Sequence, residues 1–304
     1  MALSSYTAVI KEGDVEKLRG ILEERGFEFK EKQYAHYGAK KGKLNVTVYE
    51  KGPKVLVQGK ETEDFVQFIL EPEILGEARL GNEEVSMPEM FEPHFGVDES
   101  GKGDFFGPLV IAGAYVNKEI ARKLMDGGVM DSKRISSDKK ITQLAETIRK
   151  TRGVAWEVIV LRPEKYNELY GKFGNLNRLL AWGHAAVIRS LAEKVPSCPR
   201  ALSDQFAREE LLQGALKQQG ESVEHIELQQ RTKGESDVAV AAASILAREA
   251  FVDWIQRASE KGGVKMPLGA GAHVVESARE IVEKYDRAIL EKVAKTHFKT
   301  TQQI

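Results

Sequence analysis

The stretch that decides the fold runs from Phe95 to Val116 and reads FGVDESGKGDFFGPLVIAGAYV. It contains two adjacent acids, a Gly-Lys-Gly turn and an apolar run typical of a buried strand. Neighbouring side chains of a strand point to opposite faces, so two successive acids place at least one carboxylate where burial is expected. Because a buried ionised carboxylate is costly unless it is paired or bound to a metal, the stretch predicts either a solvated acidic turn or a cation site.

The turn that follows the acids favours the cation site. Gly101 and Gly103 let a ligand approach the backbone closely, and Lys102 supplies a charge that suits phosphate. A P-loop would require G-x-x-x-x-G-K-[ST], and the glycine after the lysine excludes that motif. The acid pair Asp98 and Glu99 beside a phosphate-binding turn therefore indicates metal-assisted phosphodiester chemistry, with Mg²⁺ as a suitable ion.

The composition sets limits on the class of protein. The 304 residues carry 45 Lys and Arg against 46 Asp and Glu, so any attraction to nucleic acid must be local. The sequence contains no run of 18 or more uncharged apolar residues, so we expect no membrane span. Its N-terminal residues lack the pattern of an export signal. The single cysteine, Cys198, cannot form an internal disulfide and fits a reducing, cytoplasmic setting.

The first part of the chain predicts a small α+β domain over residues 1–80. Apolar spacing predicts a helix over 14–25, strict alternation predicts a β-hairpin over 44–58, and a second helical piece covers 61–70. Residues 81–94 mix acids, two prolines and a glycine without any period, so we interpret them as a linker.

The second part, residues 95–304, predicts an α/β domain with about five strands separated by helices. The strongest helical patterns cover 175–194, 236–259 and a terminal stretch over 276–295. The helix over 236–259 begins with a run of alanines, which predicts that it packs closely on the sheet.

Three further acids lie near predicted strand ends. Asp204 closes a short strand, where ligands of open α/β sheets gather. Glu235 and Asp237 precede the alanine-rich helix, and close packing of that helix would bring them near the same sheet edge. Ordinary helix capping explains an acid at this position equally well. The segment DSKRIS (131–136) is typical of a solvated loop when taken alone.

Five ordered motifs give the second domain a family resemblance. GVDESGKGDFFGPLVIAGAYV, DSK, NLNRLLAWGHA, DQFA and VAVAAASILAR resemble bacterial ribonuclease HIII, a relative of ribonuclease HII. The resemblance implies a ribonuclease H-like fold with a mixed five-stranded sheet flanked by helices. NVTVYEKGPKVLVQGK in the first domain also resembles the N-terminal extension of that family, which is similar to half of a TATA-binding protein.

The resemblance also implies an activity. Members cleave the RNA strand of RNA/DNA hybrids endonucleolytically and leave 5′-phosphate and 3′-hydroxyl ends. Four acids hold two divalent ions, Mg²⁺ or Mn²⁺. Asp98, Glu99 and Asp204 match the first three acids; Glu235 is our choice for the fourth, with Asp237 as the alternative.

The same comparison implies contacts to the substrate. The predicted ribose-phosphate contacts are Ser100, Gly101, Lys102, Gly103, Ser132 and Lys133. For the helix over 175–194, which contains Asn175, Asn177 and His184, structural capping is favoured over direct catalysis. Asp104 is not assigned as a metal ligand, and its neighbours indicate a turn or a salt bridge.

The first domain has a local basic signal that suits nucleic acid. Lysines between residues 30 and 60 alternate with aromatic residues, a combination that favours phosphate contact and stacking. The predicted surface comprises Tyr34, Tyr37, Lys40, Lys41, Lys43 and Tyr49. The expected partner is an RNA/DNA hybrid, bound by a cytoplasmic monomer that requires no protein partner. A non-catalytic hybrid-binding protein and a ribonuclease HII-like enzyme acting at single ribonucleotides are the alternatives.

Overall fold

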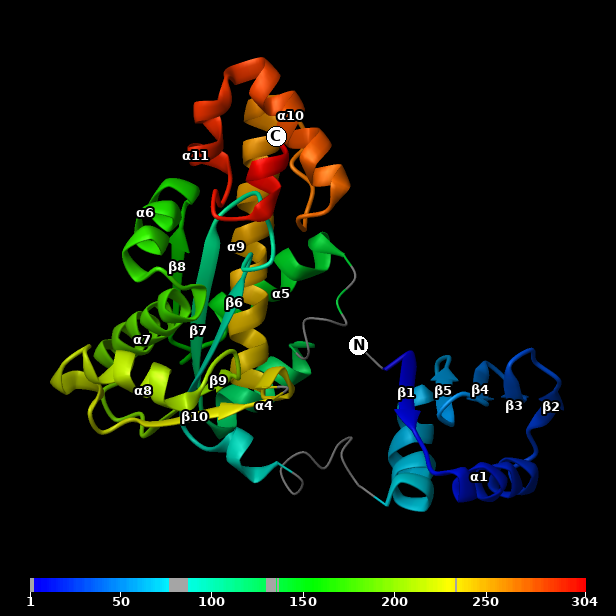
Figure 1. The fold of residues 1–304 in the computed structure, drawn as a ribbon. Coiled ribbons are helices and arrows are strands. Elements are labelled where there is room, and N and C mark those ends of the chain that lie inside the picture. The colour runs from blue at the N-terminus through cyan, green and yellow to red at the C-terminus, as the bar shows by residue number, and fades with distance from the viewer. Residues whose placement is uncertain (1–2, 77–86, 130–134, 136, 233) are drawn as a thin grey trace. The chain divides into compact units, whose positions relative to one another are not determined.

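The computed structural model describes residues 3–76, 87–129, 135, 137–232 and 234–304 (Figure 1). The chain forms two compact units, Met1–Pro88 and Glu89–Ile304, and each has its own sheet. Within the described ranges, no helix is long and apolar enough to span a membrane.

The boundary between the units corrects the predicted linker at its C-terminal end. The short 3₁₀ helix η2 (Pro88–Phe91) buries Met90 and Phe91, and His94 begins the first strand of the second unit. The mixed composition of 81–94 gave no sign that these two apolar side chains would be buried. Residues 81–86 lie outside the described residues.

The first unit is an antiparallel sheet with helices packed on one face. Its strands are β1 (Ser5–Val9), β2 (Glu28–Lys30), β3 (Ala35–Lys41), β4 (Leu44–Tyr49) and β5 (Lys54–Gln58), in the order β1-β5-β4-β3-β2. The helical segments are α1 (Glu12–Glu24), α2 (Thr62–Phe65) and its π-helical continuation η1 (Val66–Leu75). Alternate residues such as Val46 and Val55 face these helices and form the core with Leu18 and Leu22. The predicted hairpin and both helical pieces are confirmed.

The second unit contains a mixed five-stranded sheet, as predicted. The strands are β6 (His94–Ser100), β7 (Leu109–Val116), β8 (Trp156–Leu161), β9 (Arg200–Asp204) and β10 (Glu227–Arg231), in the order β10-β9-β6-β7-β8. β6 is central: it runs antiparallel to β7 and parallel to β9, which in turn runs parallel to β10. The strand that carries the acid pair therefore lies in the middle of the sheet.

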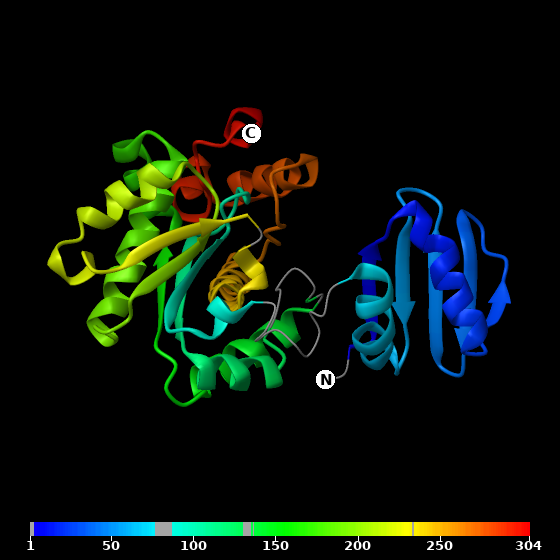
Figure 2. The same cartoon turned by 90° about the horizontal axis from the view of Figure 1, so that it is seen from below.

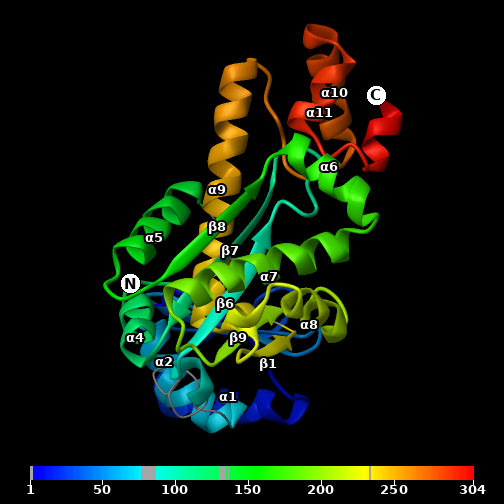
Figure 3. The ribbon, with the colours of Figure 1, turned by 90° about the vertical axis from the view of Figure 1, so that its left-hand side faces the viewer.

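Helices cover both faces of this sheet. The described helices of this unit are α4 (Lys118–Asp126), α5 (Asp138–Lys150), α6 (Pro163–Phe173), α7 (Leu176–Lys194), α8 (Glu209–Lys217), α9 (Val238–Gly262), α10 (Ala272–Tyr285) and α11 (Leu290–Val293). Short 3₁₀ turns are η4 (Glu221–Val223), η5 (Gly234–Ser236), η6 (Arg287–Ile289) and η7 (Lys299–Gln303). Figure 2 shows α9 nearly end-on, with the sheet between it and α7, and Figure 3 views the side that α7 covers.

The C-terminal helix predicted over 276–295 is wrong as a single helix. α10 ends at Tyr285, and Asp286 adopts a left-handed φ of 82°. The carboxylate of Asp286 accepts the N–H of Ala288 at 2.7 Å and begins η6. This local cap breaks the helix although the apolar spacing continues.

The alanine-rich start of α9 packs directly on β6, as predicted. A Cβ placed on Gly96 would lie 2.2 Å from the carbonyl carbon of Ala239, so only glycine allows this approach. The fit brings the first turns of α9 against the strand that carries Asp98 and Glu99.

Candidate active site

Asp98 and Glu99 lie near the end of β6 and reach toward opposite layers of the second unit. The Asp98 carboxylate accepts a hydrogen bond from Ser244 of α9. Glu99 Oε2 lies 3.0 Å from Nε2 of His184, which belongs to α7 on the other face. The Glu99 side chain is only 4% exposed, so the strand does place an acid pair in the interior.

Burial and neighbouring charged or hydrogen-bonding groups perturb both carboxyl groups. Burial, and then the charge of Glu99, raises the pKa of Asp98 to about 7, against the opposing hydrogen bond from Ser244. Burial also acts to raise the pKa of Glu99, but His184 and Lys102 outweigh it and lower that pKa to about 2. Negative charge is therefore more stable on Glu99 than on Asp98, and a cation near the pair would favour ionisation of Asp98.

His184 orients Glu99 from a fully buried position. Its Nδ1 lies 3.0 Å from Oγ of Ser203, and its ring packs on Phe206 with 4.7 Å between centroids. Because Glu99 is ionised, His184 Nε2 carries the hydrogen and donates it to the carboxylate. Ser203 thus holds the imidazole at Nδ1, and the imidazole fixes the Glu99 head group through Nε2.

The polar residues of α7 divide between two roles. Asn175 caps the helix, as predicted, because its Oδ1 accepts the N–H groups of Asn177 and Arg178. His184 contacts Glu99 instead, which the sequence interpretation missed. The available signal was a histidine among the apolar residues of a buried helix face, including Leu180 and Ala181.

Lys102 brings a positive charge to the carboxylates. Its Nζ lies 2.6 Å from Oε1 of Glu99. Burial acts to lower the pKa of Lys102, but the charges of Glu99, Asp98 and Asp204 raise it overall. An ammonium therefore sits in the field of three carboxylates, an environment of oxygen donors that also fits a hard divalent cation.

Asp204 is beside Asp98 because β9 runs parallel to β6. The register pairs Val97 with Ser203, so the next residue of each strand is an aspartate. Asp204 Oδ1 accepts the N–H of Gly234 at 3.0 Å. A Cβ on Gly234 would lie 3.0 Å from Asp204 Cα, so the turn η5 packs directly on the end of β9.

The turn η5 contains the fourth candidate acid, Glu235, which directly follows the Gly234 that donates its N–H to Asp204. The side chain of Glu235 lies outside the described part of the structure. Among the side chains that are described, no three carboxylate, imidazole or thiol groups gather closely enough to hold a metal ion as they stand. The case for a cation at this site rests on the carboxylates of Asp98, Glu99 and Asp204, whose negative charges all act on Lys102.

Known proteins resemble this chain over both units. A sequence model of the family described as Ribonuclease HII matches residues 95–301. Ribonuclease HIII of Chlamydia pneumoniae is 47% identical over 290 residues, which are 94% of this chain and 93% of that protein. The chain belongs to the ribonuclease HIII family. Ribonuclease HIII of Chlamydia trachomatis serovar L2 is 43% identical over 304 residues, covering 99% and 97% of the two chains. The chain is accordingly a ribonuclease H.

Solved ribonuclease HIII structures share the fold. The crystal structure of Bst-RNase HIII in complex with Mn²⁺ has a TM-score of 0.67 and 28% identity, covering 99% of this chain and 97% of its own. Aquifex aeolicus RNase H3 has a TM-score of 0.54 and 25% identity, covering 96% and 99%. Both likenesses extend over nearly the whole chain and therefore include residues of both units.

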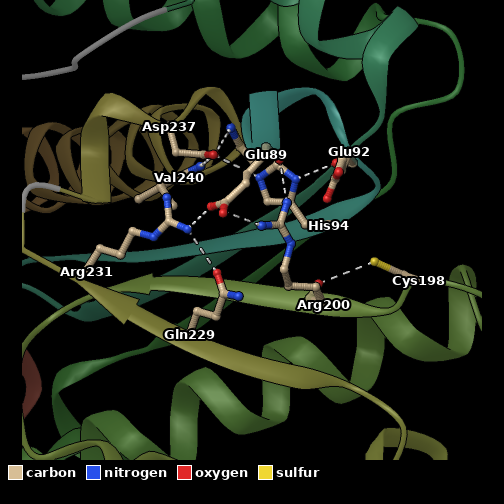
Figure 4. Close-up of polar contacts among 10 residues, drawn as sticks. Glu89, Glu92, His94, Cys198, Arg200, Gln229, Arg231, Asp237 and Val240 are labelled. Atoms are coloured by element: carbon tan, nitrogen blue, oxygen red, sulfur yellow. Dashed lines mark hydrogen bonds and ion pairs between the residues drawn. The ribbon is translucent and has the colours of Figure 1, made fainter. Parts of the chain in front are cut away.

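In this ribonuclease HIII family member, the carboxylate of Asp237 is fully engaged at the start of α9 (Figure 4). Oδ1 accepts the N–H groups of Ala239 at 2.8 Å and Val240 at 3.3 Å. Both carboxylate oxygens also lie within 3.1 Å of Nε2 of His94, whose Nδ1 donates to the Glu92 carbonyl. Asp237 therefore caps α9 and pairs with His94, and these contacts favour Glu235 over Asp237 as the fourth acid.

Asp104 anchors the turn, one of the two roles predicted for it. Its Oδ1 accepts the N–H of Gly269 at 2.6 Å, across 165 residues of sequence. Ser100 is the last residue of β6, while Gly101 has a left-handed φ of 86°. The predicted contacts Ser132 and Lys133 lie outside the described residues.

The predicted nucleic-acid surface of the first unit needs one correction. Tyr37 is buried and donates its hydroxyl hydrogen to the Val15 carbonyl at 2.8 Å, so it belongs to the core and not to the surface. A register shift between Ala35 and Tyr37 changes which face the later residues of β3 occupy. The remaining members are exposed or half-buried: Tyr34, Lys40, Lys41, Lys43 and Tyr49.

Proposed function

We propose that the chain hydrolyses the RNA strand of RNA/DNA hybrids with two divalent ions, Mg²⁺ or Mn²⁺, leaving 5′-phosphate and 3′-hydroxyl ends. One observation carries this proposal: the parallel register of β6 and β9 sets Asp98 and Asp204 at neighbouring strand ends, and the charges of these two acids and Glu99 all act on the Lys102 ammonium. The single buried cysteine supports a cytoplasmic location, and we propose a monomer that requires no protein partner.

The four acids Asp98, Glu99, Asp204 and Glu235 would hold the ions. When bound, such ions lower the pKa of the attacking water and stabilise charge on the leaving oxygen. In the reaction a water oxygen forms a bond to phosphorus while the bond from phosphorus to the 3′-oxygen breaks. His184 and the Gly234 N–H keep Glu99 and Asp204 oriented throughout.

The Gly101–Gly103 turn would bind the ribose and phosphate at the cleaved bond. Gly101 must be glycine, since a Cβ there would lie 2.4 Å from the Pro108 carbonyl and 2.8 Å from the Phe251 ring. Among the described residues, and apart from its two chain neighbours, no atom lies within 4 Å of the Cβ position of Gly103, so this side of the turn is open to a ligand. Contact of the turn and Glu99 with the 2′-hydroxyl would distinguish RNA from DNA.

Alanine substitutions at the two glycines should separate folding from substrate binding. Gly103→Ala should leave the melting temperature within about 2 °C of wild type while lowering kcat/KM roughly 10-fold or more, because the added methyl meets only the substrate. Gly101→Ala should lower the melting temperature, because its φ of 86° and its tight contacts disfavour a side chain. Calorimetry and steady-state cleavage of a labelled hybrid measure both effects. Unchanged kcat/KM for Gly103→Ala would remove the substrate role of that side of the turn.

The first unit would bind the hybrid through the helix-free face of its sheet. That face presents Lys40, Tyr49 and Lys54, while Lys32 lies with its Nζ 5.7 Å from the Tyr49 ring centroid. Phosphate contacts without base readout fit such a surface.

Reversing charge on this face should weaken binding without changing the chemistry. Lys40→Glu combined with Lys54→Glu should raise the Kd for a hybrid about 10-fold or more at moderate salt, because two phosphate contacts become repulsive. kcat at saturating hybrid should stay within about 2-fold, since the catalytic acids are untouched. Lys11→Glu, an exposed reversal at the start of α1, is the matched control. Equal Kd values for the double variant and this control would refute a binding role for the face.

The proposed function is tested by a product analysis. The purified protein is incubated with a fully hybrid duplex, with an all-DNA duplex and with DNA containing one ribonucleotide, in Mg²⁺ and in Mn²⁺. Cleavage of the hybrid with 5′-phosphate and 3′-hydroxyl ends by mass spectrometry, and its loss on chelation, is the expected result. Binding without cleavage in either metal would instead identify a non-catalytic hybrid-binding protein. Cleavage confined to the single ribonucleotide would identify a ribonuclease HII-like specificity.

A further inference from the structure

A fully buried lysine lies directly beneath the turn that follows the catalytic acids. Lys295, which follows α11, is 0% exposed. Its Nζ donates to three backbone carbonyls, at 2.9 Å to Asp104, 3.3 Å to Phe106 and 2.7 Å to Gly107. An ammonium has three N–H donors, so this set of acceptors satisfies the group completely.

The backbone around Lys295 pairs with the same loop. Lys295 N–H donates to the Phe105 carbonyl at 2.8 Å, and Gly107 N–H donates to the Val293 carbonyl at 2.9 Å. Phe106 and Ala294 form an antiparallel bridge between these bonds. The C-terminal segment therefore acts as a short extra strand along residues 105–107.

A second segment holds the loop from another side. Gly269 donates its N–H to the Asp104 carboxylate at 2.6 Å and accepts the N–H of Phe105 at 2.8 Å. The rings of Tyr166 and Phe251 lie 5.6 Å and 5.9 Å from Lys295 Nζ, so the ammonium also faces aromatic surfaces.

The loop needs such support because it has little regular structure of its own. Residues 101–107 contain no helix or strand beyond the bridge at Phe106, and both ends are left-handed glycines, Gly101 and Gly107. Ordering each backbone residue costs about 1–2 kcal/mol of conformational entropy, so contacts from elsewhere must fix the loop. Lys102 and Gly103 take their positions relative to Glu99 from this anchored loop.

We infer that Lys295 is a positioning residue of the active site, which with Asp104 sets the Gly-Lys-Gly turn against the catalytic acids. The inference rests on the substrate role proposed for that turn. Lys295 does not touch substrate, because it is fully buried beneath the loop. It acts through the carbonyls of residues 104, 106 and 107.

The test is a double-mutant cycle between Lys295 and Lys102. The variants are Lys295→Met, which keeps the apolar stem and removes the ammonium, Lys102→Ala, and the pair together. Lys299→Met is the matched control, since Lys299 is an exposed lysine of the same C-terminal segment. All are assayed on a labelled hybrid well below the lowest melting temperature, with kcat and KM determined separately.

Lys295→Met should lower kcat/KM about 10- to 100-fold in the wild-type background, the loss expected when reacting groups shift by about 1 Å. In the Lys102→Ala background the same change should cost less than about 3-fold, because the group that it positions is already absent. Lys299→Met should stay within about 2-fold of wild type. Equal losses in both backgrounds, or a Lys295→Met variant as active as the control, would overturn the inference.

Asp104 keeps the inference testable where Lys295→Met does not fold. Asp104→Asn retains an oxygen acceptor for Gly269 and should stay within about 3-fold of wild type, whereas Asp104→Ala should lose about 10-fold and show the same non-additivity with Lys102→Ala. An additive Asp104→Ala loss contradicts the inference. Asp98→Asn in the same assay separates the two proposals. An active Asp98→Asn variant removes the proposed function and this inference with it, whereas an inactive one beside a normal Lys295→Met variant removes only the inference.

Discussion

Asp98→Asn is expected to lower kcat for hybrid cleavage by about 10³-fold or more while hybrid binding persists. Asparagine has nearly the same shape and keeps an oxygen that accepts from Ser244, so the site should remain folded. What it removes is the negative charge that the bound cation requires. Cleavage of a labelled hybrid in Mg²⁺ and Mn²⁺, together with a gel-shift measurement in chelator, gives the two halves of this result.

The stability of the same variant provides an internal check. Burial and the charge of Glu99 raise the pKa of Asp98 to about 7, so ionised Asp98 is disfavoured in the metal-free protein. Replacing it with a neutral amide should therefore leave the melting temperature at pH 8 unchanged or higher. Asp126→Asn, an exposed acid at the end of α4, is the matched control and should cleave normally. Cleavage by Asp98→Asn within 10-fold of this control would contradict the role of Asp98.

The core of the candidate site could be predicted because it is local in sequence. Asp98, Glu99 and the Gly-Lys-Gly turn lie within six consecutive residues, and strand geometry alone places the acids on opposite faces. Asp204 could be predicted as a site residue because it lies at the end of a second strand. The structure adds the parallel register that sets these two strand ends side by side.

The supporting contacts could not be predicted because they join distant parts of the chain. His184 is 85 residues from Glu99, Gly269 is 165 from Asp104, and Lys295 is 188 from Gly107. No local pattern marks such pairs, because each depends on which loops the completed fold brings together. For this reason the sequence did not predict that Asp104 binds the N–H of Gly269.

The error in the first unit has a different cause. Tyr37 belongs to a segment rich in lysine and aromatic residues, which favoured a surface position. A register shift between Ala35 and Tyr37 interrupts the alternation, and a one-residue slip exchanges the two faces of a strand. Composition describes both faces together, so it could not assign this tyrosine to the core.

Glu235→Gln and Asp237→Asn are expected to fail in opposite ways. Glu235→Gln should lower kcat about 10²-fold or more, with a melting temperature within about 2 °C of wild type, because it removes a proposed metal ligand. Asp237→Asn should lower the free energy of unfolding by about 1–3 kcal/mol, because it weakens the cap of α9 and leaves His94 without a charged partner. Cleavage by the folded Asp237→Asn variant should stay within about 10-fold of wild type.

Chemical denaturation, calorimetric titration with Mn²⁺ and hybrid cleavage together distinguish these outcomes. The Glu235→Gln variant should bind Mn²⁺ more weakly, whereas the Asp237→Asn variant should bind it normally at a temperature where it is folded. The opposite pattern, with Mn²⁺ binding and activity lost only in Asp237→Asn, would make Asp237 the fourth ligand. That result would require its carboxylate to leave Ala239, Val240 and His94, at the cost of the helix start that packs on Gly96. These contacts of Asp237 are the reason that Glu235 is our proposed fourth ligand.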